Sequence, residues 1–218
     1  MKRTCTPKQV QQIQYETLDW TGTWAEAFGR PEVNETWFVM GPSAGGKSSF
    51  VMQLAKQLCK TGKVLYLSYE EGVSQSVQER LQRFRMDEVN ARFTIAQEWT
   101  VSDLRESLKK QRSARFVIVD SFQMSTWTYE DVAQLRADFP KKCFIYVSQE
   151  WKGQPLGKPA TRLRYLAGVK IRVAGFRAYC QGRFSGDPGC FYTVWEDGVI
   201  RATNNLPTEV DKQQISNN

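Results

Sequence analysis

Residues 37–53 read W-F-V-M-G-P-S-A-G-G-K-S-S-F-V-M-Q, and this stretch decides the fold. Within it, residues 41–48 fit the phosphate-binding pattern G-x-x-x-x-G-K-[ST] at every fixed position. The apolar run 37–40 leads into the loop as a buried strand would, and apolar residues recur at helical spacing after it. A chance glycine-rich turn before a helix is the alternative. Because both flanks are correct, we interpret the stretch as a strand, a phosphate-binding loop and a helix.

The loop supplies the predicted nucleotide-binding residues, which are Gly41, Pro42, Ser43, Ala44, Gly45, Gly46, Lys47, Ser48 and Ser49. Its glycines let backbone N–H groups converge on phosphates, and the helix N-terminus adds partial positive charge. We expect Lys47 to reach the β- and γ-phosphates and Ser48 to hold Mg²⁺. The sequence therefore predicts ATP and Mg²⁺ as ligands.

Composition sets broad limits on the class of protein. The 218 residues suit one α/β domain with a short extension, and no apolar run approaches the roughly 20 residues of a membrane span. No apolar segment follows the basic N-terminus, so we expect a cytoplasmic chain without a secretory signal, and no membrane partner. The five cysteines are scattered without a C-x-x-C pair, and we interpret them as reduced thiols.

Two further features of the composition bear on chemistry. The chain has no histidine, which excludes a histidine general base, a Ser-His triad and histidine ligation of a metal. The net charge of +7 favours an anionic partner, and nucleic acid is the obvious candidate. Charge alone is weak evidence, because many basic proteins are merely soluble.

The chain divides into an N-terminal arm packing on the core (1–34), a core (35–203) and a polar, flexible tail (204–218). In the core, apolar strand patterns alternate with helical ones, which predicts a mainly parallel twisted sheet flanked by helices. Residues 150–159 read as a polar loop. Turn signals at 187–189 and at Asp197-Gly198 then predict short antiparallel strands at the C-terminal edge.

Acidic side chains follow two of the predicted strands. Asp120 ends an apolar strand, where a carboxylate can hold Mg²⁺, although a strand-end Asp can also cap a helix. Glu70 and Glu71 follow the strand after the loop's helix, at the edge where open parallel sheets bind ligands. With no histidine, a carboxylate is the natural group to orient or deprotonate the attacking water. We choose Glu70 for this role and interpret Glu71 as a solvated loop acid.

A glutamine and a basic stretch complete the candidate residues. Gln149 ends a strand at the same edge, where its amide can contact the γ-phosphate; a capping role fits equally well. The candidate DNA-binding residues, which lie with Trp151 and Tyr165 beside a Gly/Pro-rich loop, are Lys152, Lys158, Arg162 and Arg164. Cationic side chains neutralise phosphates and aromatic rings stack on bases. A solvated basic face is the alternative.

The chain resembles the RecA-like P-loop ATPases, most nearly the RadA-type recombination ATPase and the DnaB-type helicase core. The matching segments are 41–48, 64–71, 117–123 and 147–149, and residues 181–186 look like a degenerate K-N-R-F-G segment. The resemblance implies a catalytic trio of Lys47, Glu70 and Gln149, with Mg²⁺ on Ser48 and Asp120. It also implies a homo-oligomeric ring or filament, in which Arg183 of a neighbour completes the site.

The same resemblance predicts an ATP hydrolase acting on DNA, single-stranded DNA being expected, in recombination, repair or replication. The RadA-type segment has Lys where this chain has Gln181, and we expect a core without the accessory domains of either family. Such a core is expected of a phage or mobile-element protein, which places it in a bacterial or phage-infected cell. Two alternatives stay open: a nucleotide-gated regulatory or assembly module with weak ATPase activity, and a small translocating helicase of DnaB type.

Overall fold

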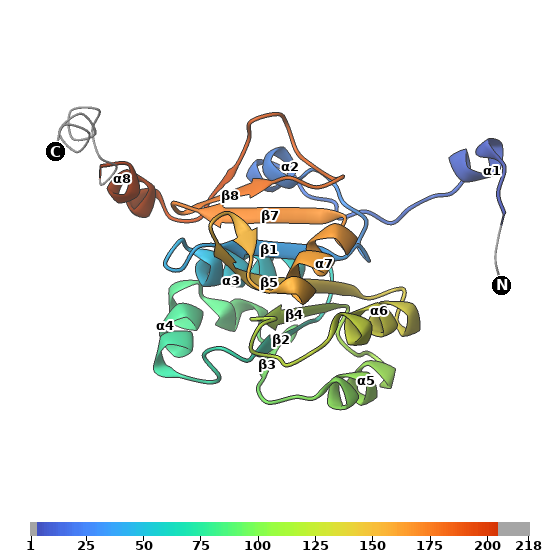
Figure 1. The fold of residues 1–218 in the computed structure, drawn as a ribbon, viewed down its shortest axis with the longest axis horizontal. Coiled ribbons are helices and arrows are strands. Elements are labelled where there is room, and N and C mark those ends of the chain that lie inside the picture. The colour runs from blue at the N-terminus through green and yellow to red at the C-terminus, as the bar shows by residue number, and fades with distance from the viewer. Residues whose placement is uncertain (1–3, 205–218) are drawn as a thin grey trace.

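The computed structural model describes residues 4–204, which form a sheet with helices on both faces (Figure 1). The strands are β1 (Trp37–Gly41), β2 (Val64–Ser68), β3 (Phe93–Ala96), β4 (Phe116–Asp120), β5 (Cys143–Trp151), β6 (Gln154–Pro155), β7 (Val169–Ala174), β8 (Arg177–Cys180) and β9 (Tyr192–Thr193). The helices are α1 (Pro7–Gln11), α2 (Thr23–Phe28), α3 (Lys47–Leu58), α4 (Gln75–Arg83), the 3₁₀ helix η1 (Met86–Val89), α5 (Val101–Lys109), α6 (Tyr129–Asp138), α7 (Lys158–Leu166) and α8 (Glu196–Asn204).

The strand order is β3-β2-β4-β5-β1-β7-β8-β9, with β6 pairing to β5 outside this path. The first six strands of this order, from β3 through β2, β4, β5 and β1 to β7, run parallel to one another. Strands β8 and β9 then add antiparallel pairs at the C-terminal edge. The central strands are buried on both faces, which explains their continuous apolar runs. The structure confirms the fold class expected from the sequence.

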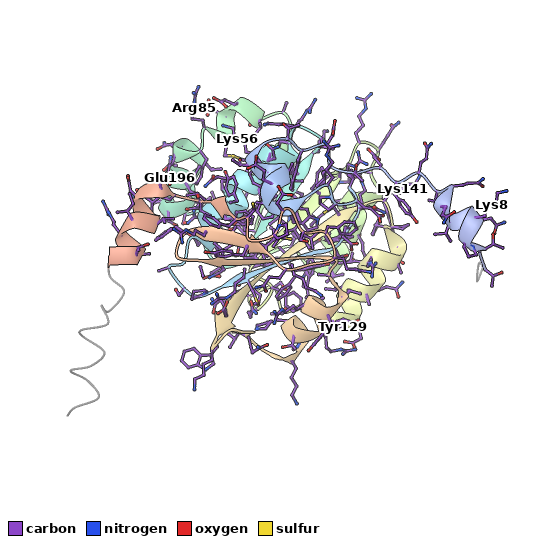
Figure 2. The ribbon with its side chains drawn as sticks, turned by 90° about the horizontal axis from the view of Figure 1, so that it is seen from above. Lys8, Lys56, Arg85, Tyr129, Lys141 and Glu196 are labelled. Carbon is purple, nitrogen blue, oxygen red and sulfur yellow. The ribbon has the colours of Figure 1, made fainter. Side chains whose placement is uncertain are left out.

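Two apolar clusters, one on each face, form the core. The first joins the sheet to α2, α3 and α4, and includes Phe28, Phe50 and Leu54. The second joins it to α5, α6 and α7, and includes Leu104 and Leu135. The view from above in Figure 2 separates Lys56 and Arg85 on one face from Tyr129 on the other. Alternate residues of each strand face different clusters. Successive side chains at a strand end therefore point to opposite faces of the sheet.

The helices on the second face begin at defined caps. Thr100 and Asp103 form a capping box at α5, and Thr128 and Asp131 form one at α6. In each box the threonine hydroxyl accepts a hydrogen bond from a backbone N–H of the first turn, and the aspartate accepts one in return. These caps fix where the loops after β3 and β4 end and where α5 and α6 begin.

Two expectations about the C-terminal third are wrong. Residues 150–159, expected as a loop, contain the end of β5, the short strand β6 and the start of α7, because Glu150 pairs with Pro155 and Trp151 with Gln154. Asp197-Gly198, expected as a turn, lies inside α8. Gly198 packs so closely that a Cβ there would lie 2.3 Å from the Trp195 ring, so the glycine serves helix packing and not a turn.

The N-terminal residues divide into an exposed part and an anchored part. Helix α1 stands away from the sheet in Figure 1, and Val10 and Ile13 are exposed. Leu18 and Trp20 are buried, and the Trp20 ring lies 5.6 Å from that of Trp37. Of the expected tail, 204–218, only Asn204 is described, as the last residue of α8. Among the described helices, none has both the length and the apolar character needed to cross a bilayer.

Candidate nucleotide-binding and hydrolytic site

The loop of residues 41–49 joins β1 to α3 and takes its shape from its backbone. Ala44 and Gly46 have φ values of 57° and 96°, and α3 begins at Lys47 directly after Gly46. The Val173 carbonyl of β7 packs over the loop, so that a Cβ at Gly41 would lie 1.9 Å from its oxygen. The Phe176 N–H donates to Gly45 O at 3.2 Å. The predicted nucleotide-binding residues therefore form one tight turn at a helix N-terminus, the geometry suited to phosphate.

Lys47 lies at the start of α3 with three carboxylates around it. Its ammonium donates to Pro42 O within the loop, at 2.8 Å. Burial lowers the pKa of Lys47, and the nearby charges of Glu70, Asp120 and Glu150 act in the opposite direction. Side chains predicted from separate parts of the sequence thus lie within electrostatic reach of this lysine.

Asp120 occupies the end of β4, paired in register with Ser68 of β2. It is only 7% exposed, and its carboxylate accepts a hydrogen bond from the Tyr66 hydroxyl. Burial raises the pKa of Asp120 to about 6; the Tyr66 hydrogen bond lowers it, and the nearby charges of Glu70 and Glu71 raise it further. A carboxyl that resists ionisation in this way gains from a bound cation.

The donor set at Asp120 fits Mg²⁺. The Tyr66 hydrogen bond uses one carboxylate oxygen of Asp120, and Ser48 in the first turn of α3 supplies a hydroxyl. Within residues 4–204 no group of three histidine, cysteine or acidic side chains is placed to hold a metal ion. Mg²⁺ commonly takes one or two protein oxygens together with substrate phosphates and water.

The two adjacent glutamates have different surroundings. Glu71 is held by Arg80, whose guanidinium nitrogens lie 2.9 and 3.1 Å from its two oxygens, and it also accepts from Ser76. Burial raises the pKa of Glu71, but these hydrogen bonds outweigh it and leave the pKa lowered. Glu70 instead accepts from the Gln149 amide at 3.4 Å. Only Glu70 of the pair therefore faces the strand that adjoins the loop.

Gln149 is positioned by β5, where it pairs in register with Gly41, the first residue of the loop. Gln123, which the sequence reasoning left without a role, holds this strand end in place. Its amide nitrogen donates to Ser148 Oγ at 2.6 Å and to Leu156 O at 3.0 Å, and its oxygen accepts from Gln149 N at 3.3 Å. One side chain thus connects the segment after Asp120, the Gln149 strand end and the β5–β6 hairpin.

An ion pair that the sequence reasoning missed crosses β1. Arg172 of β7 donates from Nε and Nη2 to the two oxygens of Glu150 on β5, both at 2.8 Å. The Glu150 side chain is 4% exposed and that of Arg172 36%. Hydrogen bonding to Glu150 raises the pKa of Arg172. Alternation in β7 indicates that Arg172 faces away from α3, but no local signal identifies its partner.

The four candidate DNA-binding residues have different environments. Lys152 on the β5–β6 hairpin and Lys158 at the start of α7 are exposed. Arg164 donates to Gln154 at 3.4 Å. Arg162 is engaged with α6, where it donates to Glu130 at 3.0 Å and lies 3.8 Å from the centre of the Tyr129 ring. The lysines are therefore freer than the arginines to meet an anionic partner.

Arg183 lies at the other end of the sheet. Its N–H donates to Gly168 O at 2.8 Å, next to the start of β7, and β7 begins beside Trp37 at the start of β1. The loop of residues 41–49 follows the opposite end of β1. Within one copy Arg183 is therefore separated from this loop by the length of the strands, and its role as a trans-acting cation stays a prediction.

A scan against protein-family models found no match for this sequence, and a search of curated proteins found none. Among solved structures, the chain is similar to the crystal structure of flagellar accessory protein FlaH from Methanocaldococcus jannaschii. The two are 15% identical with a TM-score of 0.56, and the match covers 82% of this chain and 93% of that chain.

A second solved structure, described as an ATPase domain, matches at 13% identity over 64% of this chain and 69% of that chain. Its TM-score is 0.44. The likeness to FlaH and the strand order show a RecA-like P-loop fold. At this level of identity the likeness shows the fold and nothing of the activity.

Proposed function

We propose that this chain is a magnesium-dependent ATPase of RecA type that acts on DNA in recombination, repair or replication, as a phage or mobile-element protein. The observation that carries the proposal is the convergence of Lys47, Glu70, Asp120 and Gln149, from four separate segments, around one helix N-terminus. Convergence of a phosphate-binding loop with two carboxylates and an amide is the arrangement that nucleoside triphosphate hydrolysis requires.

Each residue has a distinct part in the proposed reaction. The loop's N–H groups and Lys47 bind the phosphates and neutralise charge that develops on them. Glu70 orients the attacking water and accepts its proton, and Gln149, in contact with Glu70, lies where it can contact the γ-phosphate. Ser48 and Asp120 would hold Mg²⁺, which when bound neutralises charge on the phosphate oxygens.

The test is ATP hydrolysis by three variants, each also checked for unchanged melting temperature. Lys47→Ala should abolish turnover by weakening nucleotide binding. Glu70→Gln should lower kcat by about 100-fold or more with nucleotide binding retained, since general-base catalysis contributes on the order of 100- to 10,000-fold. Glu71→Gln is the matched control, because its carboxylate pairs with Arg80. Equal losses in the two glutamate variants would contradict the assignment.

The DNA-binding part of the proposal rests on the β5–β6 hairpin and the start of α7. Trp151 and Tyr165 are strongly exposed there, beside Lys152 and Lys158. Exposed aromatic rings next to lysines suit single-stranded DNA, which offers bases to stack on and phosphates to neutralise. Stimulation of ATP hydrolysis by single-stranded DNA, fading as salt rises, is the expected result.

The homo-oligomer is supported by the place of Arg183, exposed at the end of the sheet opposite to its own loop. In a ring or filament a neighbouring copy would bring this guanidinium to the loop. Arg183→Ala should then lower turnover without lowering the affinity of one copy for nucleotide. Mixing this variant with Lys47→Ala should restore part of the activity, because each would supply the group that the other lacks.

A second candidate function is a nucleotide-gated regulatory module with weak hydrolysis. Two observations favour it: Arg162 is already engaged by Glu130 and Tyr129, and Gln181 stands where the resembling family has Lys. ATP binding without any response to DNA would support this alternative. If DNA does stimulate hydrolysis, a strand-displacement assay separates a small translocating helicase from a recombination ATPase.

A further inference from the structure

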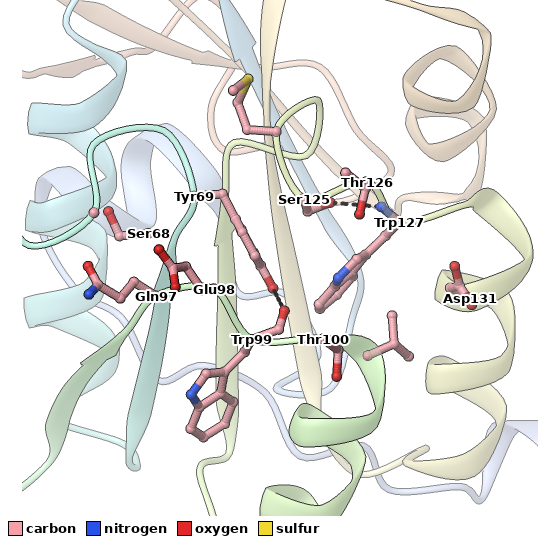
Figure 3. A pocket seen from close by; sticks show the side chains of 13 residues that line it. Ser68, Tyr69, Gln97, Glu98, Trp99, Thr100, Ser125, Thr126, Trp127 and Asp131 are labelled. Atoms are coloured by element: carbon pink, nitrogen blue, oxygen red, sulfur yellow. Dashed lines mark hydrogen bonds between the residues drawn. The ribbon is translucent and has the colours of Figure 1, made fainter.

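A cavity of about 530 Å³ opens at the C-terminal ends of the parallel strands, on the face of the sheet covered by α5 and α6 (Figure 3). The segments that follow β2, β3 and β4 form its walls. The proposed hydrolytic site lies on the opposite face of the sheet, which α3 covers. The loop after β2 therefore lies between the two sites. None of the residues assigned to nucleotide or DNA lines this cavity.

Aromatic rings form two walls of the cavity. The rings of Tyr69 and Trp127 stand nearly perpendicular, with an interplanar angle of 73° and centroids 6.0 Å apart. The Tyr69 hydroxyl donates to Trp99 O, which fixes the ring. Burial raises the pKa of Tyr69 to about 12, so its phenol carries no charge at neutral pH. Two rings at right angles are half of an aromatic cage of the kind that binds cations.

The charges around the cavity have one sign. Glu98 and Asp131 line it, and Figure 3 shows Glu98 beside Tyr69 and Asp131 beyond Trp127. The charge of Asp103 also acts on Tyr69. The lining includes no lysine or arginine, although the chain has 30 of them.

Neighbouring guanidinium groups do not neutralise this negative charge. Arg80 pairs with Glu71, and Arg105 pairs with Asp138. An anionic ligand, DNA phosphate included, would be repelled from the cavity, whereas a cation would be attracted both by the carboxylates and by the ring faces.

We propose that this pocket binds the cationic side chain of an arginine, or less well a lysine, presented by a protein segment. A guanidinium is planar and weakly hydrated, so it can stack on one ring while its N–H groups meet carboxylates. Trp127 is 6% exposed, and its indole N–H makes no hydrogen bond of normal geometry within the described residues, although it lies near enough to the Tyr69 hydroxyl to oppose, in part, the rise that burial causes in the pKa of Tyr69. A better-placed acceptor such as a peptide carbonyl, which free guanidinium would not bring, can still engage this donor.

The pocket has a direct route to the proposed hydrolytic site. Tyr69 and Glu70 are successive residues, and their N–H groups donate to the same acceptor, Asp120 O, at 2.7 and 3.3 Å. A ligand that shifts Tyr69 therefore bears on Glu70 and on the strand end that carries Asp120. This coupling, unlike the binding itself, rests on the proposed function.

The test uses N-acetyl-arginine amide as the probe and N-acetyl-citrulline amide as its uncharged equivalent. Binding is followed by NMR at the Trp127 indole N–H, assigned with the variant Trp127→Phe. We expect a saturable shift with the arginine probe and binding at least about fivefold weaker with citrulline, because citrulline loses both cation–π and carboxylate attraction. Equal binding of the two probes, or no saturable shift, would overturn the proposal.

Glu98→Gln should weaken arginine binding by a similar factor. Glu106→Gln, an exposed acid on α5 outside the cavity, is the matched control and should leave binding unchanged. Equal effects of the two variants would also overturn the proposal. The titration needs no nucleotide, so loss of the proposed ATPase function and loss of this binding are separate results.

Self-association of the two variants then identifies the source of the arginine. If Glu98→Gln self-associates more weakly than Glu106→Gln, a second copy of the chain supplies the side chain. If both associate alike while only Glu98→Gln loses the arginine probe, another protein supplies it. Either result supports the pocket.

Discussion

The loop of residues 41–49 and the β5–β6 hairpin extend from the same edge of the sheet, and different forces hold them. Backbone packing shapes the loop, because Val173 O leaves no room for a side chain at Gly41. Side chains from distant segments hold the hairpin: Arg172 binds Glu150 at its base, and Gln123 binds Leu156 O. The shape of the loop thus requires a residue without a side chain at Gly41. The shape of the hairpin requires partner side chains that lie elsewhere in the chain.

This difference explains which of the two regions can be recognised in a sequence. A shape set by local backbone geometry requires glycine at fixed spacing, and that spacing is a motif. A shape set by two long-range contacts places no requirement on neighbouring residues.

The largest effect is expected at the glycine most tightly enclosed. Gly41→Ala would place a Cβ 1.9 Å from backbone oxygen, and β1 and β7 would have to separate. We expect a loss of about 3 kcal/mol or more in the free energy of unfolding, at the upper end for overpacking. The control is Gly153→Ala in the hairpin, where a Cβ meets nothing within 4 Å and φ is +78°. Its loss should be about 1–2 kcal/mol. Similar losses in urea denaturation would contradict the comparison.

The next effect concerns Asp120, whose buried carboxylate lowers the stability of the folded protein when it is ionised. Its pKa is raised from 3.8 to about 6 in the folded protein, so the folded state binds the proton more tightly than the unfolded state. The stabilisation from this proton is present below pH 4 and is lost as pH rises through 6. Asp120→Asn should therefore raise stability at pH 8 by up to about 3 kcal/mol and abolish magnesium-dependent hydrolysis. Thermal melts at about pH 4 and pH 8, either side of this window, measure the difference; an equal change at both would disprove this origin.

A smaller effect is expected at the base of the hairpin. Glu150→Gln removes the charge that faces Arg172 in a nearly buried ion pair. Since Arg172 is about one third exposed, we expect a loss of about 1–2 kcal/mol, less than for a fully buried pair. The exposed Trp151 at the end of β5 should become more accessible, which fluorescence quenching by acrylamide would detect. Glu106→Gln serves as the control for removal of an exposed acid. Unchanged quenching would show that the β6 backbone pairing alone holds the hairpin.

The smallest effects are expected for the exposed lysines of the proposed DNA surface. Lys152→Gln and Lys158→Gln should each weaken single-strand binding a few-fold and reduce the salt slope by about 0.7, the value for one phosphate contact. Arg162→Gln should change the slope less, because its guanidinium is engaged by Glu130 and Tyr129. Lys8→Gln on α1, which Figure 2 places far from the sheet, is the control. A larger slope change at Arg162 than at Lys152 would reverse this order.

The sequence predicts the sheet and the loop because both depend on local patterns. Continuous apolar runs identify the central strands, and the glycine spacing identifies residues 41–49. It predicts the place of Asp120 and Glu70 as well, since strand ends in a parallel sheet meet at one edge. The chemical roles assigned to them stay predictions.

What could not be predicted depends on contacts distant in the chain. Gly198 looks like a turn residue after Asp197, but packing against Trp195 and Phe176 makes it a helix residue. Glu150 and Arg172 lie 22 positions apart on strands separated by β1, so neither indicates the other. The cavity at Tyr69 is formed by three loops, and no single segment carries its pattern.

The hydrogen bond from Lys47 to Pro42 O also has a consequence for the thermodynamics of ligand binding. A long lysine side chain loses up to about 2 kcal/mol of rotational freedom when it is fixed in place. Here the loop carbonyl already restricts that freedom during folding. When a phosphate binds, the Lys47 ammonium would exchange the Pro42 carbonyl for a more strongly charged acceptor. Because the side chain is already held in place, less rotational entropy would be lost on binding. In the proposed nucleotide site the lysine would therefore be preorganised for its phosphate, and its neutral partner Pro42 O would tune affinity without itself bearing charge.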